Sequence, residues 1–214
     1  MKHPQYIFIH HTAVSYKKNP DQWRATDAYH RTKNWGTKKK PIYIKEPSSL
    51  GYYGGYNYEV AADGSIKQFR QDGETTVAQY QQTMNDGRAL SICLDMNGDI
   101  EWPTRQQRDK VKEMLEIKMK SYNISKENIR CHRSVATYKS CPGLLLPDDI
   151  YSYFITHTDM ENENPKPVLF DWAKPAWAWA AQYGIINIDS EPTLEFQRAI
   201  VIQHRFWQKF LQSK

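Results

Sequence analysis

Residues 6–11 read YIFIHH, and this short stretch decides how the rest of the chain is interpreted. Alternating β-branched and aromatic residues are typical of a β-strand, here one that opens a domain. Because side chains alternate across a strand, His10 shares a face with Phe8. His11 shares the opposite face with Ile9. The two adjacent histidines are therefore expected to point to opposite sides of a sheet.

The segments after this strand alternate between helical and extended patterns. The Asp63-Gly64 pair between two short segments is the strongest local signal for a hairpin turn, and Pro103 and Thr104 are start signals for a long amphipathic helix. We expect strands at residues 56–60, 66–69, 90–94 and 129–132, and helices at residues 21–33 and 104–122. These elements predict an α/β fold with a mixed central β-sheet flanked by helices.

The length of 214 residues allows one domain of about 150 residues with its own core, and an appendage after it. Residues 161–167 read ENENPKP, a polar, proline-containing stretch that is typical of a linker. We therefore expect a main domain at 1–158, a linker at 159–167 and a small helical hairpin at 168–214. Helical patterns at 172–183 and 193–211 predict the two helices of that hairpin.

The net charge of +5 is not spread evenly along the chain. Residues 159–214 hold six Lys/Arg and seven Asp/Glu, which leaves 23 basic and 17 acidic residues for the main domain. A positive main domain suits an anionic polymer such as cell wall, although a solvated basic face explains the charge equally well. We find no nucleic-acid-binding motif, and the 14 Tyr and 7 Trp fit either carbohydrate binding or an aromatic core.

The sequence shows neither a membrane segment nor a disulfide framework. No apolar run approaches the roughly 20 residues that span a bilayer, and the first residues lead directly into the strand, so we expect no signal peptide. Three cysteines, at positions 93, 131 and 141, are an odd and widely spaced set that argues against disulfides. Reduced thiols, one of them on a metal, fit better.

Three residues are candidates for a metal site: His10, His132 and Cys141. Two imidazoles and a thiolate make three ligands, the number that a catalytic zinc needs when its fourth position stays open for water. Each residue also has an ordinary interpretation, because a single histidine is more often a packing or surface residue and Cys141 fits a buried thiol. Spacing alone therefore leaves both interpretations open.

Three blocks of sequence resemble the type-2 N-acetylmuramoyl-L-alanine amidases, a family that includes phage T7-type lysozyme and animal peptidoglycan recognition proteins. The blocks are IHHTA at 9–13, GYNY at 55–58 with DG at 63–64, and HR at 132–133 with CPG at 141–143. They occur in the family's order, and the resemblance covers roughly residues 5–155. Two departures are Ala78-Gln79, where the family commonly has Ala-His, and a His132-to-Cys141 interval one residue longer than usual.

The resemblance implies a role for each matching residue. It makes His10, His132 and Cys141 the ligands of Zn²⁺, with His11 outside the set. Tyr56 matches the family's catalytic tyrosine and Lys139 the lysine of its phage-type branch, which favours an active enzyme. Residues expected to line the substrate groove are Thr12, Asn85 and Arg133.

Elementary chemistry supports the same roles. A zinc ion with these ligands activates water for attack on an amide carbon, and Tyr56 and Lys139 are donors for the resulting oxyanion. The general acid that protonates the leaving amine stays open between Tyr56, Lys139 and water. Without the resemblance, Tyr56 fits a strand aromatic and Lys139 a solvated loop lysine equally well.

The predicted function is hydrolysis of the amide bond between N-acetylmuramic acid and L-alanine in peptidoglycan. The layout resembles a phage or prophage endolysin, made in the host cytoplasm and released to the wall through a separate pore. A cell-wall recycling amidase and a non-catalytic peptidoglycan-binding protein are the alternatives. We expect no nucleic-acid partner and no membrane insertion.

The tail has a resemblance of its own. DWAK at 171–174 and WAAQYGII at 179–186 resemble the opening of an S-layer-homology motif, which implies binding of a secondary cell-wall polymer. Such motifs usually occur in threes and this chain has one, so a stabilising or oligomerising hairpin is the alternative. Trp177 and Trp179 then belong either to a core or to a ligand platform.

Overall fold

The computed structural model describes residues 2–33, 47–79, 82–156, 173–183, 185–186, 197, 200 and 203–204. The chain divides into two compact units, Met1–Met160 and Glu161–Lys214. The predicted linker 159–167 lies outside the described residues, as does most of the predicted helix 193–211.

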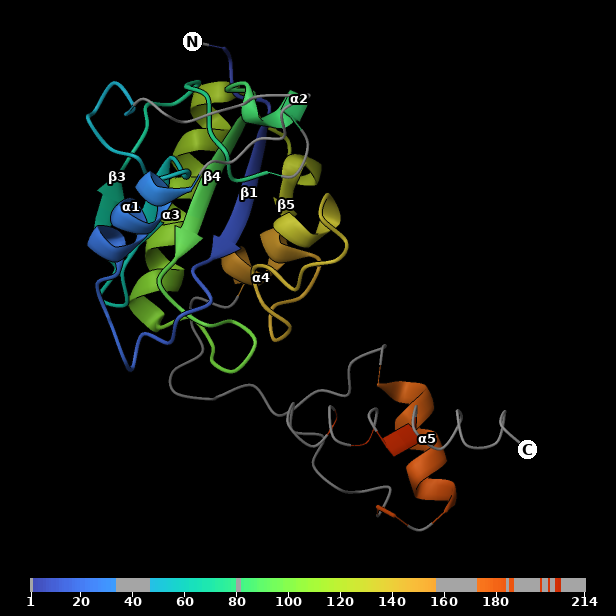
Figure 1. The fold of residues 1–214 in the computed structure, drawn as a ribbon. Helices are drawn as coiled ribbons and strands as arrows, with labels where there is room; N and C mark the ends of the chain where they lie inside the picture. Colours follow the sequence, from blue (N-terminus) through green and yellow to red (C-terminus); the bar gives the residue numbers. More distant parts are fainter. Residues whose placement is uncertain are drawn as a thin grey trace. The chain divides into compact units, whose positions relative to one another are not determined.

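A five-stranded mixed sheet forms the centre of the first unit (Figure 1). Its strands are β1 (Tyr6–His11), β2 (Tyr58–Val60), β3 (Ile66–Gln68), β4 (Ala89–Leu94) and β5 (Ile129–Cys131), in the order β3-β2-β4-β1-β5. β1 runs parallel to β4 and β5, β2 runs parallel to β4, and β3 is antiparallel to β2. The predicted mixed sheet is confirmed, with the opening strand between β4 and the edge strand β5.

Helices cover both faces of this sheet, which is why β1 and β4 are buried almost throughout. In Figure 1, α1 lies in front of the sheet and α3 behind it. The helices of this unit are α1 (Trp23–Thr32), α2 (Gln82–Asn85), α3 (Arg105–Tyr122) and α4 (Ile150–Thr156), with 3₁₀ turns η1 (Lys126–Asn128) and η2 (His132–Ser134). The predicted helices correspond to α1 and α3.

Four details of the sequence prediction were wrong. It missed α2 and α4, because helices of four and seven residues complete too few turns to show a periodic pattern. It also placed Tyr56 and His132 within strands. β2 begins only at Tyr58, and His132 opens the η2 turn directly after β5. Both residues therefore lie at strand ends, where loops rather than the pleat direct side chains.

Local chemistry explains where α3 and the hairpin begin and turn. The Thr104 hydroxyl accepts from the backbone N–H of Gln107, whose side chain accepts from the Thr104 N–H, a capping box that satisfies two donors at the helix start. In the β2–β3 turn, Gly64 has φ of 81°, a conformation that glycine adopts without strain. The Asp63 carboxylate accepts from the backbone N–H of Ser65 at 2.9 Å. The predicted hairpin turn is confirmed.

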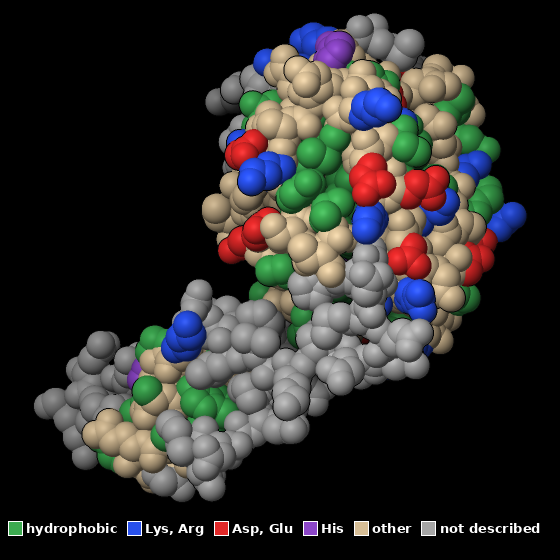
Figure 2. All heavy atoms as spheres, turned by 180° about the vertical axis from the view of Figure 1, so that it is seen from behind, with side chains coloured by type: hydrophobic (Ala, Val, Ile, Leu, Met, Phe, Trp, Pro, Cys, Tyr) green, Lys and Arg blue, Asp and Glu red, His purple; other side chains and the backbone are tan. Residues whose placement is uncertain are grey.

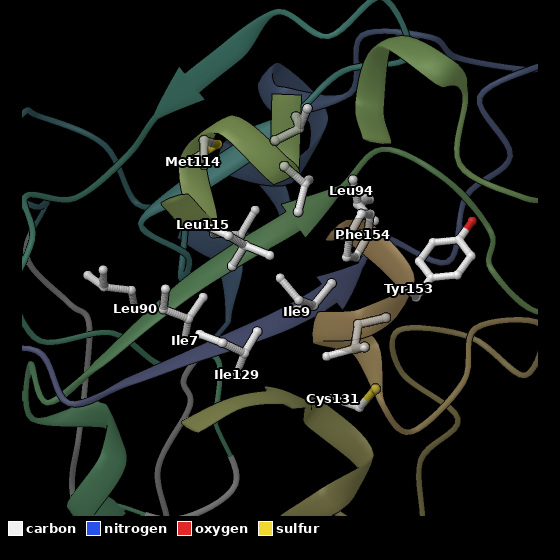
Figure 3. Packing of buried hydrophobic residues seen from close by; sticks show 14 of the residues in the cluster. Ile7, Ile9, Leu90, Leu94, Met114, Leu115, Ile129, Cys131, Tyr153 and Phe154 are labelled. Carbon is white, nitrogen blue, oxygen red and sulfur yellow. The ribbon is translucent and has the colours of Figure 1, made fainter. Parts of the chain in front are cut away.

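The hydrophobic core of the first unit lies between the sheet and helices α3 and α4 (Figure 3). Ile7 and Ile9 of β1 point into it and are fully buried. Leu115 of α3 and Phe154 of α4 meet them there (Figure 3). Because alternate residues of β1 fill this core, His10 is left for the other face.

The second unit contains α5 (Lys174–Gln182), which lies within the predicted helix 172–183. A separate hydrophobic cluster comprises Ala173, Ala176, Trp177, Ala180, Ile186 and Ile200. Trp177 is buried in this cluster and Trp179 packs against it, which favours a core role for both rings. No helix in the described part of the chain has the length and apolar character needed to cross a membrane.

Candidate active site

His10 is the penultimate residue of β1 and points to the face that α1 covers. Its partner on β4 is Cys93, and Glu59 of β2 continues the same row. His11 points to the opposite face, where its Nδ1 accepts from the backbone N–H of Gly98 at 3.0 Å. The two histidines thus make separate contacts, as the alternation predicts.

The structure brings His10, His132 and Cys141 together. All three are buried, and one ligand atom from each lies within 4.8 Å of the others. The Cys141 Sγ lies 3.7 Å from the His10 Nδ1, and the rings of His10 and His132 have centroids 4.6 Å apart. Bonds of about 2.0–2.3 Å place the ligand atoms of a tetrahedral zinc roughly 3.3–3.8 Å apart. The group could therefore hold a metal with little adjustment.

Burial controls the protonation of these three side chains. It lowers the pKa of His10 well below the ordinary value, and positive charge on His132, His11 and Lys139 lowers it further. Burial and the charge of Lys139 lower the pKa of His132 to about 4. Burial raises the pKa of the Cys141 thiol to about 12. Both imidazoles are thus neutral at pH 7, the form that binds metals, and a metal on the thiolate would displace a proton.

The loop that carries Cys141 is held in place by Arg133. Its backbone N–H donates to the carbonyl of Cys141 at 2.8 Å. Its guanidinium donates to the carbonyl oxygens of Ser140, Gly143 and Leu146 and to the carboxylate of Asp148. Arg133, predicted to line the groove, therefore directs these donors at its own chain and fixes the position of the thiol.

A close approach of two backbones fixes the same loop from the other side. Gly98 and Gly143 pack so tightly that a Cβ on either would collide with the backbone of the opposite loop, and Gly143 has φ of 127°. The carboxylate of Asp99 accepts from the Ser140 hydroxyl at 3.0 Å and from the Leu144 N–H at 2.9 Å. Residues 97–99 after β4 thus anchor the loop that presents Cys141.

Tyr56 lies beside the group, with its ring centroid 5.2 Å from that of His10. Burial raises the pKa of its phenol well above the ordinary value, and the neighbouring acidic groups Cys93, Cys141 and Glu59 raise it further. The phenol therefore keeps its proton at neutral pH and is available as a hydrogen-bond donor.

Lys139 is an exposed residue of the Cys141 loop, and its positive charge acts on all three members of the group. It also borders an open pocket of about 610 Å³ at the outer edge of β5. The other lining residues are Glu127, Ile129, Arg130, Cys131, Arg133, Ser134, Thr137 and Asp148. Lys139 thus borders this pocket and acts electrostatically on the His–His–Cys group, none of whose three members lines the pocket.

The remaining predicted site residues have different surroundings. Thr12 follows β1, is half-buried, and donates through its hydroxyl to the carbonyl of Met96 at 3.3 Å. Asn85 is buried, and its amide bonds both backbone groups of Gln79. The Gln79 side chain donates in turn to the hydroxyl of Ser91. Asn85 thus holds the segment in which glutamine stands where the family commonly has histidine.

The sequence prediction missed His30, a buried residue near the end of α1. Its ring centroid lies 5.4 Å from that of Tyr56, and its Nδ1 accepts from the backbone N–H of Gly55 at 2.8 Å. Burial lowers its pKa to about 4, so the ring is neutral and acts as an acceptor. His30 therefore positions the segment that carries Tyr56. A histidine on the inward side of an amphipathic helix was the only signal available.

Glu59 and Asp95 form a second unexpected feature, a pair of buried carboxyl groups beneath α1. Burial raises the pKa of Glu59, and the neighbouring Asp95 raises it further. Burial raises the pKa of Asp95 to about 6, and the backbone N–H of Gln22, which donates to its carboxylate at 2.8 Å, opposes this rise. Glu59 therefore holds a proton at neutral pH beside Asp95, although neither Glu59 oxygen has a hydrogen-bond partner among the described residues.

This pair predicts a pH-dependent gain in stability for Glu59→Gln. At neutral pH Glu59 keeps its proton in the folded chain. In the unfolded chain its side chain has the ordinary pKa of about 4.3 and has released the proton. The contribution of Glu59 to the free energy of unfolding is thus complete at low pH. It falls as the pH rises, by up to about 1.4 kcal/mol per pH unit. Glutamine mimics the protonated form of Glu59. The free energy of unfolding of Glu59→Gln should therefore be higher than that of the wild type at pH 8 and equal to it near pH 4.

Urea unfolding at the two pH values measures this difference. Glu116→Gln, at an exposed position of α3, is the matched control. Its difference from the wild type in the free energy of unfolding should be the same at both pH values. An equal gap between Glu59→Gln and the wild type at both pH values would show that Glu59 is ionised in the folded chain.

Fold and site together define a class of protein: an α/β domain with a buried His–His–Cys group, one member of which lies near the end of strand β1, able to hold a metal. A family model matches residues 1–144, and the chain belongs to the N-acetylmuramoyl-L-alanine amidase family, Amidase_2. Members of this family are typically zinc-dependent. The comparison with curated proteins gives no match.

Solved structures share the fold at low sequence identity. The N-acetylmuramoyl-L-alanine amidase LysC from Clostridium intestinale URNW is 21% identical with a TM-score of 0.52, over 74% of this chain and 87% of LysC. The Ph2119 endolysin from Thermus scotoductus MAT2119 bacteriophage Ph2119 is 16% identical with a TM-score of 0.53, over 75% of this chain and 88% of the endolysin. Human PGRP-IBETAC, in complex with glycosamyl muramyl pentapeptide, is 18% identical with a TM-score of 0.52, over 71% and 84%.

Proposed function

We propose that this chain is a zinc-dependent hydrolase that cleaves the amide bond between N-acetylmuramic acid and L-alanine in peptidoglycan. The buried group of His10, His132 and Cys141, with Tyr56 beside it, carries this proposal. Family membership supports the reaction, and the complex of a recognition protein with a muramyl pentapeptide supports the substrate. The endolysin neighbours support a role as a phage or prophage endolysin that is made in the host cytoplasm and reaches the wall through a separate pore.

The residues present fit a zinc ion. Two neutral imidazoles and one thiolate are ligands that zinc prefers, and three protein ligands leave one position open. The His10 Nε2 is buried and has no hydrogen-bond partner within the described residues, a costly state that a ligand would relieve. Zinc bound here would polarise the amide carbonyl and activate water.

The chain's own residues supply the rest of the site. Tyr56, which keeps its proton, donates a hydrogen bond to the oxygen that gains negative charge, and the Lys139 ammonium stabilises the same charge. Thr12 lines the groove in this proposal. Asn85 and Arg133 shape the site by holding the segments around Gln79 and Cys141.

The rival function is peptidoglycan binding without hydrolysis, because recognition proteins share the fold. Incubation with a soluble muropeptide, followed by chromatography, distinguishes the two. We expect release of the free stem peptide, loss of this activity on removal of metal by a chelator, and recovery on addition of zinc. Muropeptide that binds but stays intact with zinc present would support the recognition protein instead.

Deletion of residues 160–214 is expected to leave a folded hydrolase that cleaves soluble muropeptide at the wild-type rate but clears intact walls several-fold more slowly. The second unit has its own apolar cluster, and a tethered unit that binds a secondary wall polymer raises the effective concentration of enzyme on the wall. Turbidity of walls and turnover of muropeptide measure the two effects. Equal wall clearance would leave the tail without a binding role, and lost muropeptide activity would indicate that it stabilises the first unit.

A further inference from the structure

Three basic side chains near α1 lie over aromatic rings and not beside carboxylates, whereas Arg24 of α1 both lies over a ring and pairs with Asp21. We call Arg31, Lys33 and Lys67 the ring-held cations. Their distances to the ring centroids are 5.0 Å for Arg31 over Tyr53, 4.3 Å for Lys33 over Tyr29, 3.6 Å for Lys67 over Tyr52 and 4.3 Å for Lys67 over Trp23. Within the described part of the chain, no carboxylate lies within ion-pair distance of these three groups.

Several basic residues elsewhere on the first unit pair with carboxylates, although Arg130 and Lys139 also lie over rings, those of Tyr6 and Tyr138. The carboxylate of Asp86 pairs with Lys2 and Arg88, and Asp72 pairs with Lys118 of α3. Figure 2, which views the molecule from behind the sheet, shows basic and acidic side chains interspersed. A carboxylate cancels the charge of its partner, whereas an aromatic ring holds a cation and leaves its charge available. The ring-held cations are thus fixed in place and still able to attract an anion.

The stretch of chain that contains α1 is itself positive. Residues 17–33, which contain α1, hold five Lys/Arg and two Asp/Glu, a net +3 within a chain whose total is +5. One of the two acids, Asp27, is occupied, because its carboxylate accepts from the backbone N–H groups of Tyr53 and Gly54. The main domain is therefore positive around α1, as it is along residues 118–134, which hold five Lys/Arg and one Asp/Glu.

We propose that the ring-held cations dock a phosphodiester polymer of the cell wall next to the active site. The choice of a wall polymer rests on the proposed function. Several separated charges suit a polymer with repeated anions better than one small anion. His30, on the inward side of α1, lies 5.4 Å from Tyr56 between ring centroids, so a polymer held on the outer side keeps the site at the wall.

The ring contacts also argue against single-stranded nucleic acid as the partner. Binding of that kind needs aromatic faces on which bases stack. Here Arg24 and Lys67 both lie over the Trp23 ring, each 4.3 Å from its centroid, and Lys67 also covers Tyr52. The surface therefore offers charge rather than free rings.

Co-sedimentation of the full-length zinc-loaded protein with cell walls tests this proposal. The test variant combines Arg31→Gln, Lys33→Gln and Lys67→Gln. The control combines Lys112→Gln, Lys120→Gln and Lys126→Gln, which removes equal charge from α3 and η1. A third variant, with Arg31→Lys, Lys33→Arg and Lys67→Arg, keeps the charge. Walls are used intact and after hydrofluoric acid extraction, which removes phosphodiester polymers, and brief incubation in the cold limits cleavage.

We expect the test variant to bind intact walls about 10-fold more weakly than the wild type, because three charges that face phosphodiesters are lost. The control and the charge-keeping variant should bind normally, and extraction of the walls should weaken the wild type by a similar factor. All variants should cleave soluble muropeptide alike, which shows that they are folded and separates this inference from the proposed function.

Four results would overturn the inference. Wild-type binding by the test variant would show that the ring-held cations do not bind the wall. Equal losses of wall binding in the test and control variants would show that only the net charge matters. Undiminished binding to extracted walls would point to the carboxylates of peptidoglycan itself. Tighter binding of a single-stranded DNA oligonucleotide than of intact walls would identify nucleic acid as the partner. If the wall binding of all variants is as expected but none of them cleaves muropeptide, the proposed function is contradicted and the inference about the ring-held cations stands.

Discussion

Replacing Cys141 with serine is expected to remove zinc and lower hydrolysis by more than about 100-fold, because even residues that only support a metal ligand cost 10- to 100-fold when lost. A serine hydroxyl is a poor zinc ligand, since zinc prefers thiolate, imidazole and carboxylate. Among the described residues, His10, His132 and Cys141 are the residues placed to hold a metal together, so no fourth side chain of this group can take over from the thiolate. Metal content by elemental analysis and turnover of soluble muropeptide measure the two losses.

Cys131→Ser is the matched control for this substitution. Its thiol is also buried, but it points into the core with Ile9 and Phe154 and donates to the carbonyl of Pro147 at 3.4 Å. This variant should keep its zinc and its activity. Full zinc occupancy and activity in Cys141→Ser would show that the ligand assignment is wrong.

Removal of either oxyanion donor is expected to lower turnover by about 100-fold while zinc stays bound. Tyr56→Phe deletes a phenol that keeps its proton and lies next to His10. Lys139→Ala deletes a positive charge that acts on the whole group. Single-turnover rates on muropeptide, together with metal content, separate this effect from loss of the metal.

Tyr138→Phe is the control for both donors, because this phenol precedes Lys139 in the chain and is 70% exposed. It should retain the wild-type rate. Wild-type rates in Tyr56→Phe and Lys139→Ala would make both side chains structural. Loss of zinc from either variant would instead place that side chain among the groups that orient the ligands.

Much of the fold could be predicted because its signals are local. The alternation in residues 6–11 assigned His10 and His11 to opposite faces, and the Asp63-Gly64 pair marked the hairpin turn. The start signal at Thr104 is the N-cap of α3. Each of these features depends on residues close together in sequence, so the pattern alone carries the information.

The site was harder to predict because it depends on tertiary contacts. His30 meets Tyr56 only after α1 has packed on the sheet, and no local pattern distinguishes it from any other helical histidine. The Glu59–Asp95 pair depends on the neighbouring strands β2 and β4. The contacts of the Arg133 guanidinium with loop carbonyls up to 13 residues later also depend on how the loop folds, and its assignment to the groove stays a prediction.

Mass spectrometry of digested cell walls tests the proposed reaction most directly. Purified walls are incubated with the zinc-loaded protein, and the soluble products are sequenced and their ends identified. Amide hydrolysis predicts intact stem peptides that begin with a free L-alanine amino group, alongside glycan strands without new reducing ends. New reducing ends, or stem peptides cut internally with the muramoyl-alanine bond intact, would contradict the proposal.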